Sequence, residues 1–388
     1  MNKKTKLLFL SSEFPPGPGG IGTHTFQVSD YLNKSGLNVF ALVDQHYATK
    51  NERDQFNSTT KFPIENFATH PFFIIQFMKK FFQARKIIDA FKPDVIFASV
   101  SRSVWLGALL SHSTNVPFVA IGHGSEFGFT NPITRLINKW AFISADHIVC
   151  VSNFTHQQML EHGIKPKTSS VIYNGADTKR FFELDEIEKN NIKSELGISD
   201  KFILLTVGNV TQRKGQEIVI RALSEIIKKI PNVMYLMVGL PTNVEKLSKL
   251  ASDLGVNQYI RFMGQLDPEM VVKLNQISDI FLMTSQKLDD GDVEGFGIAV
   301  LEAALCGKPA IVSSGSGLGE AVIHNQTGLV VPVSDPAATS QAILFLSENE
   351  ILRKEMGNKA KERALSEFSW EEVAEQYLEL VHQLVKTR

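Results

Sequence analysis

The sequence is poor in cysteine and has almost no net charge. Its 388 residues include two cysteines, and the formal net charge is −1. Two cysteines in apolar surroundings do not form a disulfide framework and fit a reducing compartment, so we expect a cytoplasmic protein. A nearly neutral chain has no global field that attracts nucleic acid, and we expect no nucleic-acid partner. Any site for an anion must therefore be built locally.

Long apolar runs are also missing. The N-terminal run Leu7 to Leu10 is shorter than a signal peptide requires. No stretch approaches the roughly 20 apolar residues of a membrane-spanning helix, and no repeat of solenoid length is visible. With 43% hydrophobic and 21% charged residues, the composition is that of a soluble globular protein. The chain length predicts two domains.

Short β-rich runs alternate with longer helical patterns along the chain. In the first half the expected strands are 6–12, 38–44, 94–100, 117–124, 147–152 and 170–175, with helices near 22–35, 72–91, 102–112, 133–144 and 153–162. In the second half the expected strands are 202–210, 233–239, 259–264, 279–285, 309–314 and 328–333. Continuous apolar strands separated by helices predict an α/β fold with two doubly wound parallel sheets.

The domain limits follow from composition. Residues 176–200 are polar and contain no strand pattern, so the break between the two sheets is expected there. Residues 366–370 indicate a helix break and restart before a last amphipathic helix. We predict domains at 1–178 and 179–367, followed by the helix 368–388.

Residues 70–92 are dense in phenylalanine. Phe73, Phe77, Phe81, Ala84, Ile88 and Phe91 form one helical stripe. Such a stripe is typical of a core helix that packs on a sheet. Phe72, Ile75 and Phe82 lie off the stripe, and lysines and arginines flank them, which leaves a peripheral membrane or lipid-acceptor surface as the alternative.

The first glycine-rich loop follows the first expected strand. Gly17, Gly19 and Gly22 match the dinucleotide fingerprint G-x-G-x-x-G, with Asp44 at the end of the next strand, so an NAD-dependent oxidoreductase is one hypothesis. Residues 11–16 intervene before the first glycine, which that fingerprint does not allow. A looser interpretation keeps Gly19 and Gly20 as a place where the backbone approaches an anion at a helix start.

Two further loops carry charge after a strand. Arg213 and Lys214 come just before a helix and suit a diphosphate. The stretch EGFGIAVLE places Glu294 before a helix start near Ile298 and Glu302 on its second turn. The amides between the two carboxylates are bare, and a carboxylate is a bidentate acceptor for a vicinal diol. Ribose, diphosphate and hexose hydroxyls of a sugar nucleotide would match these groups.

The fourth loop contains His123 beside Glu126. A lone histidine is often structural, but its position at the end of a buried strand favours a functional role equally.

Taken together, these motifs resemble a known family. The stretches PPGPGGIGTH, HGSE, VSNFT, VIYNGADTKRFF, GNVTQRKG, EGFGIAVLE and GEAVIHNQTGLVVP look like the landmarks of the retaining GT-B glycosyltransferases called "glycosyl transferases group 1", in the order of that family. The resemblance covers almost the whole chain. It implies two Rossmann-like domains facing across a cleft, with the acceptor in the first, the nucleotide sugar in the second, and a last helix that crosses back to the first.

The resemblance also implies roles for individual residues. Arg213 and Lys214 would hold the diphosphate, and Glu302 the ribose hydroxyls. Glu294 would hold the transferred sugar and His123 would contact it, which makes these two the catalytic candidates. The remaining expected donor-binding residues are Gly19, Gly20, Asn209, Gly295, Phe296 and Gly297, and the expected acceptor residues are His24 and Glu126. Many members have arginine where this chain has Asn209, so the diphosphate would depend more on the other two cations.

The family implies transfer of a hexosyl unit with retention, from a UDP- or GDP-linked sugar to a hydroxyl of a glycan, lipid-linked or small-molecule acceptor. Cell-surface polysaccharide biosynthesis would be a typical setting, with possible peripheral contact on the inner membrane face. We expect no cofactor beyond the donor and no metal, although Asp289, Asp290 and Asp292 form an acidic cluster with a D-x-D pattern. A non-hydrolysing sugar-nucleotide epimerase on the same fold is the other alternative.

Overall fold

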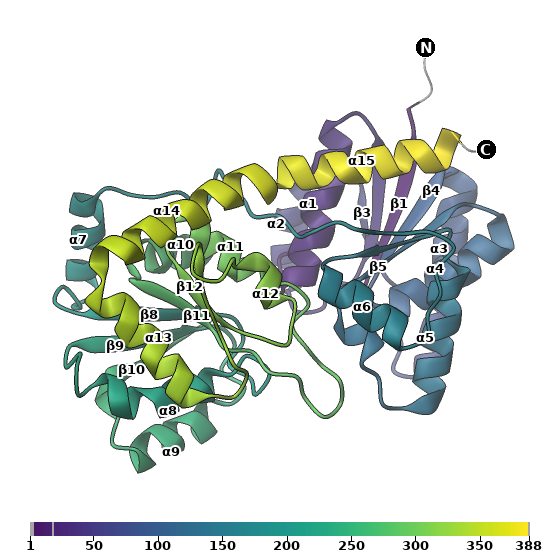
Figure 1. The fold of residues 1–388 in the computed structure, drawn as a ribbon. Coiled ribbons are helices and arrows are strands. Elements are labelled where there is room, and N and C mark those ends of the chain that lie inside the picture. The colour runs from purple at the N-terminus through teal and green to yellow at the C-terminus, as the bar shows by residue number, and fades with distance from the viewer. Residues whose placement is uncertain (1–3, 18, 387–388) are drawn as a thin grey trace. The chain divides into compact units, whose positions relative to one another are not determined.

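The chain folds into two compact units, each with its own sheet. The computed structural model describes residues 4–17 and 19–386 (Figure 1). Unit 1 comprises Met1–Asn174 together with Trp370–Arg388, and unit 2 comprises Gly175–Ser369. All strand pairs in both sheets are parallel. The expected α/β class with two doubly wound sheets is confirmed.

Unit 1 contains a seven-stranded sheet in the order β3-β2-β1-β4-β5-β6-β7. Its strands are β1 (Lys6–Ser11), β2 (Asn38–Val43), β3 (Ile64–Asn66), β4 (Val95–Ser99), β5 (Phe118–Gly122), β6 (His147–Cys150) and β7 (Ser169–Val171). Its helices are α1 (Gly20–Lys34), α2 (Lys50–Ser58), α3 (Phe73–Phe91), α4 (Ser101–Thr114), α5 (Pro132–Ser144), α6 (Asn153–Glu161) and α15 (Trp370–Lys386). The strand order reverses between β1 and β4.

Unit 2 contains a six-stranded sheet in the order β10-β9-β8-β11-β12-β13. Its strands are β8 (Phe202–Val207), β9 (Val233–Val238), β10 (Ile260–Gly264), β11 (Ile280–Met283), β12 (Ala310–Ser313) and β13 (Gly328–Val331). Its helices are α7 (Glu186–Glu195), α8 (Gln216–Ile226), α9 (Val244–Asp253), α10 (Pro268–Ile277), α11 (Ile298–Leu305), α12 (Leu318–Ala321), α13 (Pro336–Glu348) and α14 (Glu350–Glu367). Here the order reverses between β8 and β11.

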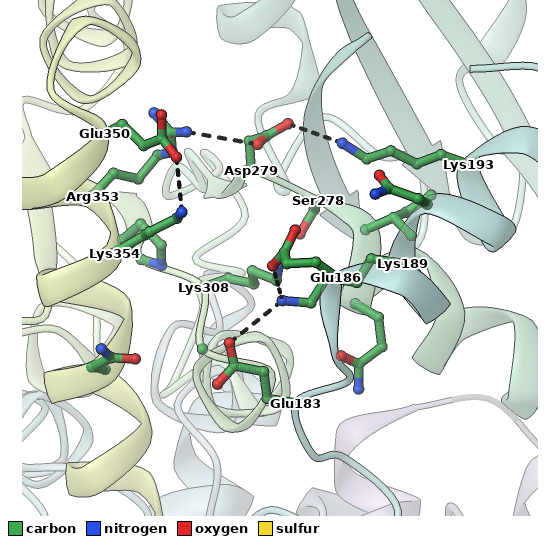
Figure 2. Close-up of a pocket in the computed structure, with 16 residues that line it drawn as sticks. Glu183, Glu186, Lys189, Lys193, Ser278, Asp279, Lys308, Glu350, Arg353 and Lys354 are labelled. Atoms are coloured by element: carbon green, nitrogen blue, oxygen red, sulfur yellow. Dashed lines mark hydrogen bonds and ion pairs between the residues drawn. The ribbon is translucent and has the colours of Figure 1, made fainter. Parts of the chain in front are cut away.

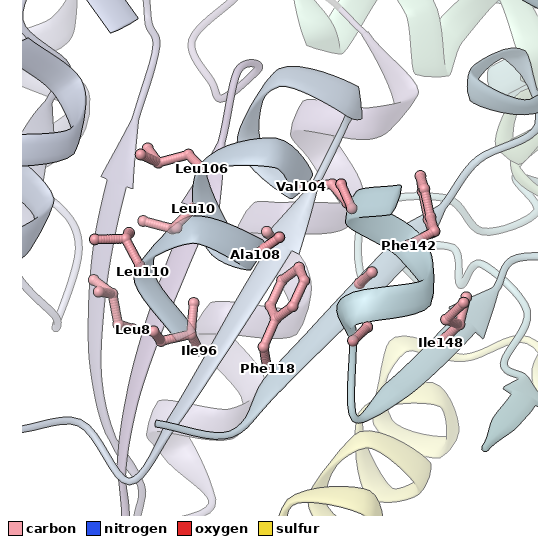
Figure 3. Packing of buried hydrophobic residues seen from close by; sticks show 14 of the residues in the cluster. Leu8, Leu10, Ile96, Val104, Leu106, Ala108, Leu110, Phe118, Phe142 and Ile148 are labelled. Carbon is pink, nitrogen blue, oxygen red and sulfur yellow. The ribbon is translucent and has the colours of Figure 1, made fainter. Parts of the chain in front are cut away.

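The central strands are apolar throughout because both faces of each sheet are covered. In unit 1, Leu8 and Leu10 of β1 point into a core formed with α3, α4 and α5 (Figure 3). The intervening Phe9 points to the opposite face and packs against Phe97 of β4, with ring centroids 5.7 Å apart. Phe97 in turn lies 6.0 Å from the ring of Tyr377 on α15. Alternating side chains of one strand therefore fill two separate layers.

Three elements differ from the sequence-based expectation. The short strand β3 and the helix α2 were not anticipated, because neither contains a fully buried residue that would mark an apolar pattern. The polar segment 176–200, where the domain break was expected, contains no strand, as predicted, but it contains the unanticipated helix α7. That helix begins at the N-cap Asp185 and buries Ile192, so it is part of unit 2. The predicted helix break near 366–370 is confirmed, because α14 ends at Glu367 and α15 begins at Trp370.

The phenylalanine-rich helix α3 divides into two halves. Toward its C-terminus Ala84, Ile87 and Ile88 are buried, and Phe77, Phe81 and Phe91 pack partly on the same core. Toward its N-terminus the apolar side chains are exposed. Phe73, a member of the predicted core stripe, is 47% exposed, so the core interpretation was wrong for the first turns of the helix.

Candidate functional site

The carboxyl edge of the unit 2 sheet brings together three of the predicted site residues. Strands β8 and β11 are neighbours and parallel, so the loops that follow them leave the sheet at the same edge. Arg213 and Lys214 come from the loop after β8, and Glu294 comes from the loop after β11. The strand order reverses between these two strands, and ligands of open α/β sheets bind at such a switch point.

Glu294 is the common partner of both cations. Its Oε2 atom accepts hydrogen bonds from Arg213 Nη1 at 2.5 Å and from Lys214 Nζ at 2.6 Å. Burial alone would raise the pKa of Glu294, but the charges of Lys214 and Arg213 outweigh it and lower the pKa to about 2. The carboxylate is therefore ionised at neutral pH. It holds both cations at the switch point.

Two glycines allow these loops to approach one another. Gly215, the N-cap of α8, has φ 70°, and a Cβ atom there would lie 1.9 Å from the Thr284 carbonyl oxygen. Gly297, the N-cap of α11, has φ 94°, and a Cβ atom would lie 2.5 Å from Leu318. Side chains at either position would separate the loops. The close approach fixes the path of the backbone from Glu294 into α11, and Gly295, Phe296 and Gly297 are buried there.

Glu302 lies in α11, one helix turn beyond its start. Burial raises the pKa of Glu302 to about 7, with the Arg180 charge lowering it and the Asp177 charge raising it. In the part of the chain that the structure describes, the carboxylate of Glu302 has no hydrogen bond or ion pair with another side chain. A half-buried carboxyl group without a protein partner can accept hydrogen bonds from ligand hydroxyls.

The other expected donor residues of unit 2 contribute backbone rather than charge. Asn209 is exposed, and its Oδ1 atom accepts from the Leu240 amide at 3.3 Å. Gly295 and Phe296 connect Glu294 to α11. The Phe296 side chain is buried against Phe368, with ring centroids 5.5 Å apart, so only its backbone can face a ligand.

The acidic cluster has a structural partner that the sequence did not indicate. Asp292 accepts from Arg213 Nε at 3.0 Å, so Arg213 lies between two carboxylates. Asp290 accepts instead from the Asp292 amide at 3.1 Å. Residues 4–17 and 19–386 contain no grouping of three metal-ligating side chains. Asp292 therefore positions Arg213, a role that only the folded chain reveals.

In unit 1 the predicted histidines lie close together. His123 follows β5 and His24 lies in α1, with ring centroids 5.0 Å apart. Burial lowers the pKa of His123 to about 3, so the ring is neutral, and its Nε2 atom is 2.7 Å from Ser99 Oγ at the end of β4. His24 Nε2 is 3.0 Å from the Tyr377 hydroxyl, and its Nδ1 atom is buried without a partner. Ser99 could have been found from its place at a strand end, whereas Tyr377 has no local signal.

Glu126 supports the His123 backbone. Its Oε2 atom accepts from the His123 amide at 3.0 Å, and burial raises the pKa of the carboxyl group to about 7. Gly19 is the N-cap of α1, which begins at Gly20, so both glycines lie at a helix start, and the anion-loop interpretation stays a prediction. Asp44 is bound by Lys80 at 2.6 Å and is not free to receive a ribose.

Two doubly wound sheets, with charged residues at the switch point of one of them, are typical of nucleotide-binding α/β enzymes. Two family models match the chain. "Glycosyltransferase Family 4" matches residues 18–180 and "Glycosyl transferases group 1" matches residues 188–363. The chain contains a glycosyl transferases group 1 domain and has the GT-B fold, as the sequence motifs indicated.

Relatives of known name differ in their substrates. The chain is 27% identical over 370 residues to a GDP-mannose-dependent alpha-(1-6)-phosphatidylinositol monomannoside mannosyltransferase of Mycolicibacterium smegmatis, covering 94% of this chain and 95% of that protein. It is 26% identical over 279 residues to an N-acetyl-alpha-D-glucosaminyl L-malate synthase of Bacillus anthracis, covering 70% and 69%. The crystal structure of Anabaena HepE with UDP and glucose superposes with a TM-score of 0.84 at 21% identity, covering 98% of this chain and all of that one.

Proposed function

We propose that the protein transfers a hexosyl unit, with retention of configuration, from a UDP- or GDP-linked sugar to a hydroxyl group of a lipid-linked acceptor. The observation that carries the proposal is the triad of Arg213, Lys214 and Glu294 at the switch point of unit 2. Two cations at the end of one strand and a carboxylate at the end of its neighbour match the diphosphate and the hexose of such a donor.

The two cations receive the diphosphate. Both are held by Glu294 without a ligand, so they stand at fixed positions before the donor arrives. The start of α11 adds backbone amides that can donate to phosphate or sugar oxygens. Glu302 accepts from the ribose hydroxyls, a role that fits its unpartnered carboxyl group.

Departure of the nucleoside diphosphate builds negative charge on phosphate oxygens. Preorganised cations stabilise that charge without reorganisation during the reaction, and Arg213 with Lys214 supplies two positive charges. The reaction on this account needs no metal ion. Glu294 is tied to both cations and is not an available nucleophile, which favours front-face attack, with the departing phosphate taking the acceptor proton.

His123 acts as a neutral group in unit 1. Its low pKa leaves the ring uncharged, so it can donate or accept one hydrogen bond to a sugar hydroxyl but cannot provide a cation. Ser99 orients the ring through Nε2. Glu126 supports the His123 backbone by accepting from its amide, and the His24 ring packs edge-on against the His123 ring.

The acceptor class is proposed from an exposed apolar face of unit 1. The side chains that form this face are Phe72, Phe73, Ile74, Ile75, Met78 and Phe82 at the start of α3 and Ile133, Leu136 and Trp140 on α5. In a parallel α/β sheet helices run opposite to the strands, so both helix starts lie at the carboxyl edge, the edge to which His123 belongs. Four exposed basic residues lie on the same helices or on the neighbouring α4: Lys79, Lys86, Arg102 and Arg135.

An apolar face with basic neighbours fits the surface of an anionic bilayer. No helix described between residues 4 and 386 is both long and apolar enough to cross a membrane. The contact we propose is therefore peripheral and occurs on the cytoplasmic side, where it would bring a lipid-linked hydroxyl to the carboxyl edge of unit 1.

Nucleotide binding tests the proposal first. Thermal unfolding is measured with UDP, GDP, ADP and NAD, and stabilisation by UDP or GDP but not by NAD is expected. Stabilisation by NAD alone would favour the oxidoreductase, which the family match and the Asp44–Lys80 pair do not favour. Incubation with the matching nucleotide sugar then separates a transferase, which releases nucleoside diphosphate to an acceptor, from an epimerase, which converts the sugar without one.

A further inference from the structure

A second charged pocket lies at the opposite edge of the unit 2 sheet. It has a volume of about 330 Å³, and its wall includes Ser278 and Asp279 just before β11 and Lys308 just before β12 (Figure 2). These residues stand at the amino ends of parallel strands, whereas Arg213 and Glu294 follow the carboxyl ends. The pocket is therefore separate from the donor site. None of the sequence motifs pointed to it.

Cations line the inside of this pocket and most carboxylates lie at its rim. The side chains of Lys189, Lys193 and Arg353 are only 10%, 18% and 13% exposed. Two of the carboxylates, Glu186 and Glu350, are 74% and 64% exposed. Water screens the rim carboxylates far more than the inner cations, so the interior has an excess of positive charge.

The inner cations are Lys189, Lys193, Lys308 and Arg353, and the two inner carboxylates do not neutralise all four. Lys189 also pairs with the rim carboxylate Glu186 at 3.0 Å. Asp279 is shared by Lys193 and Arg353, each 3.9 Å away, and it also accepts from the Ile203 amide at 2.7 Å. Glu183 is shared by Lys189 at 3.4 Å and Lys361 at 3.1 Å. Both acids are thus already committed to more than one donor.

Of the four inner cations of the pocket, Lys308 is the one that these acids do not contact. Among the described residues its ammonium group has no ion pair and no hydrogen bond, although it lines the same pocket as Lys189 and Lys354 (Figure 2). Burial, with the neighbouring Lys189 charge, lowers the pKa of Lys308 to about 8. A partly buried ammonium without a partner is unfavourable, and an anionic ligand would supply the missing partner.

From this geometry we infer that the pocket at the amino edge of unit 2 binds a small phosphate monoester, whose phosphate group contacts Lys308, Lys193 and Arg353. A phosphate dianion offers three acceptor oxygens and two charges, which suits several cations including one guanidinium. The volume is at the lower end of the range for small-molecule sites, so a triose or hexose phosphate fits and a nucleotide sugar does not.

Isothermal titration calorimetry tests the inference with inorganic phosphate, glycerol 3-phosphate and a hexose 6-phosphate. Saturable binding of one phosphate ester per chain is expected. Lys308→Met should weaken it by about tenfold or more, since a charge-assisted hydrogen bond is lost. The matched control is Lys354→Met, at the rim and paired with Glu350 at 2.8 Å, which should change the affinity by no more than about twofold.

The donor-site variant Lys214→Met distinguishes the two sites. It should bind the phosphate ester as the wild type does, while Lys308→Met should bind UDP or GDP normally. Three results would each overturn the inference. They are loss of phosphate-ester binding in Lys214→Met, the same phosphate-ester affinity in Lys308→Met as in the wild type, and no saturation of the wild type up to about 10 mM phosphate ester. Should Lys308→Met fail to unfold cooperatively, Lys193→Met serves in its place, because Lys193 contacts Asp279 only at 3.9 Å.

Discussion

The Lys214 ammonium lies 2.6 Å from the Glu294 carboxylate, although 80 residues separate them in the chain. Adjacent strands β8 and β11 create this proximity, and Arg213 completes the group. The lowered pKa of Glu294 means that the folded state binds its proton less tightly than the unfolded state. The pair therefore stabilises the fold above pH about 4.5, and that stabilisation is lost as the pH falls toward about 2.

Removing Lys214 should abolish transfer. We expect Lys214→Met to weaken UDP or GDP binding by about tenfold to a hundredfold, because one charge-assisted contact to the diphosphate is lost. Titration calorimetry and a donor-consumption assay measure the two effects. Lys228→Met, an exposed lysine of the same unit at 62% exposure, is the matched control and should behave as the wild type.

Glu294→Gln should affect sugar transfer without weakening the binding of the nucleoside diphosphate. It frees both cations, so nucleoside diphosphate should bind at least as tightly as in the wild type. Turnover should nevertheless fall by about a hundredfold or more, since the variant no longer positions the transferred hexose. Near-normal turnover in either Lys214→Met or Glu294→Gln would show that the assigned roles are wrong.

Glu302→Gln should stabilise the protein at high pH and weaken donor binding. The folded-state pKa of about 7 lies above the ordinary 4.5, so the native state holds more protons and stability falls as the pH rises between these values. Glutamine removes that dependence, and a gain on the order of 1 kcal/mol is expected near pH 8. Thermal unfolding near pH 5 should show little difference between the two proteins. An equal shift at both pH values would contradict the assignment to Glu302 ionisation.

Ser99 should act as a positioning residue for His123. Ser99→Ala removes the 2.7 Å contact to Nε2, and we expect kcat to fall by about tenfold while KM for the donor changes little. Ser99→Thr, which keeps the hydroxyl group, should restore activity. Ser103→Ala is the matched control, because Ser103 lies nearby and contacts Ser12 instead, at 2.9 Å. A purely structural role would lower the melting temperature without this split between kcat and KM.

The apolar face of unit 1 should bind anionic vesicles. The wild-type protein should sediment with phosphatidylglycerol vesicles. In the double variant Ile74→Ser, Phe82→Ser, the fraction of protein bound to the vesicles should fall by about tenfold. Vesicles of phosphatidylcholine should bind less protein, since the basic residues gain nothing there. Ile351→Ser is the control, because Ile351 is 78% exposed on α14 in unit 2. If the double variant binds the vesicles as well as the wild type does, the apolar face of unit 1 is not the membrane-binding surface.

The sequence by itself determined the class of fold and most of its elements. Short continuous apolar runs such as Leu7 to Leu10, repeated between longer helical patterns, are typical of strands covered on both faces, and the helices between them show the period of 3.6 residues. The same local information placed Arg213, Lys214, Glu294 and Glu302 in loops or helix starts after strands. This was possible because residues adjacent in the sequence determine where a strand ends and where a helix starts.

Only the tertiary structure decided which of these residues meet. The order β9-β8-β11-β12 puts two distant loops at one switch point, and pairing across the fold joins Arg213 to Asp292. His24 and Tyr377, 353 residues apart, make contact for the same reason. The exposure of the first turns of α3 and the cationic pocket around Lys308 also depend on what packs nearby. Local periodicity cannot encode such contacts, because they arise from long-range packing of whole elements.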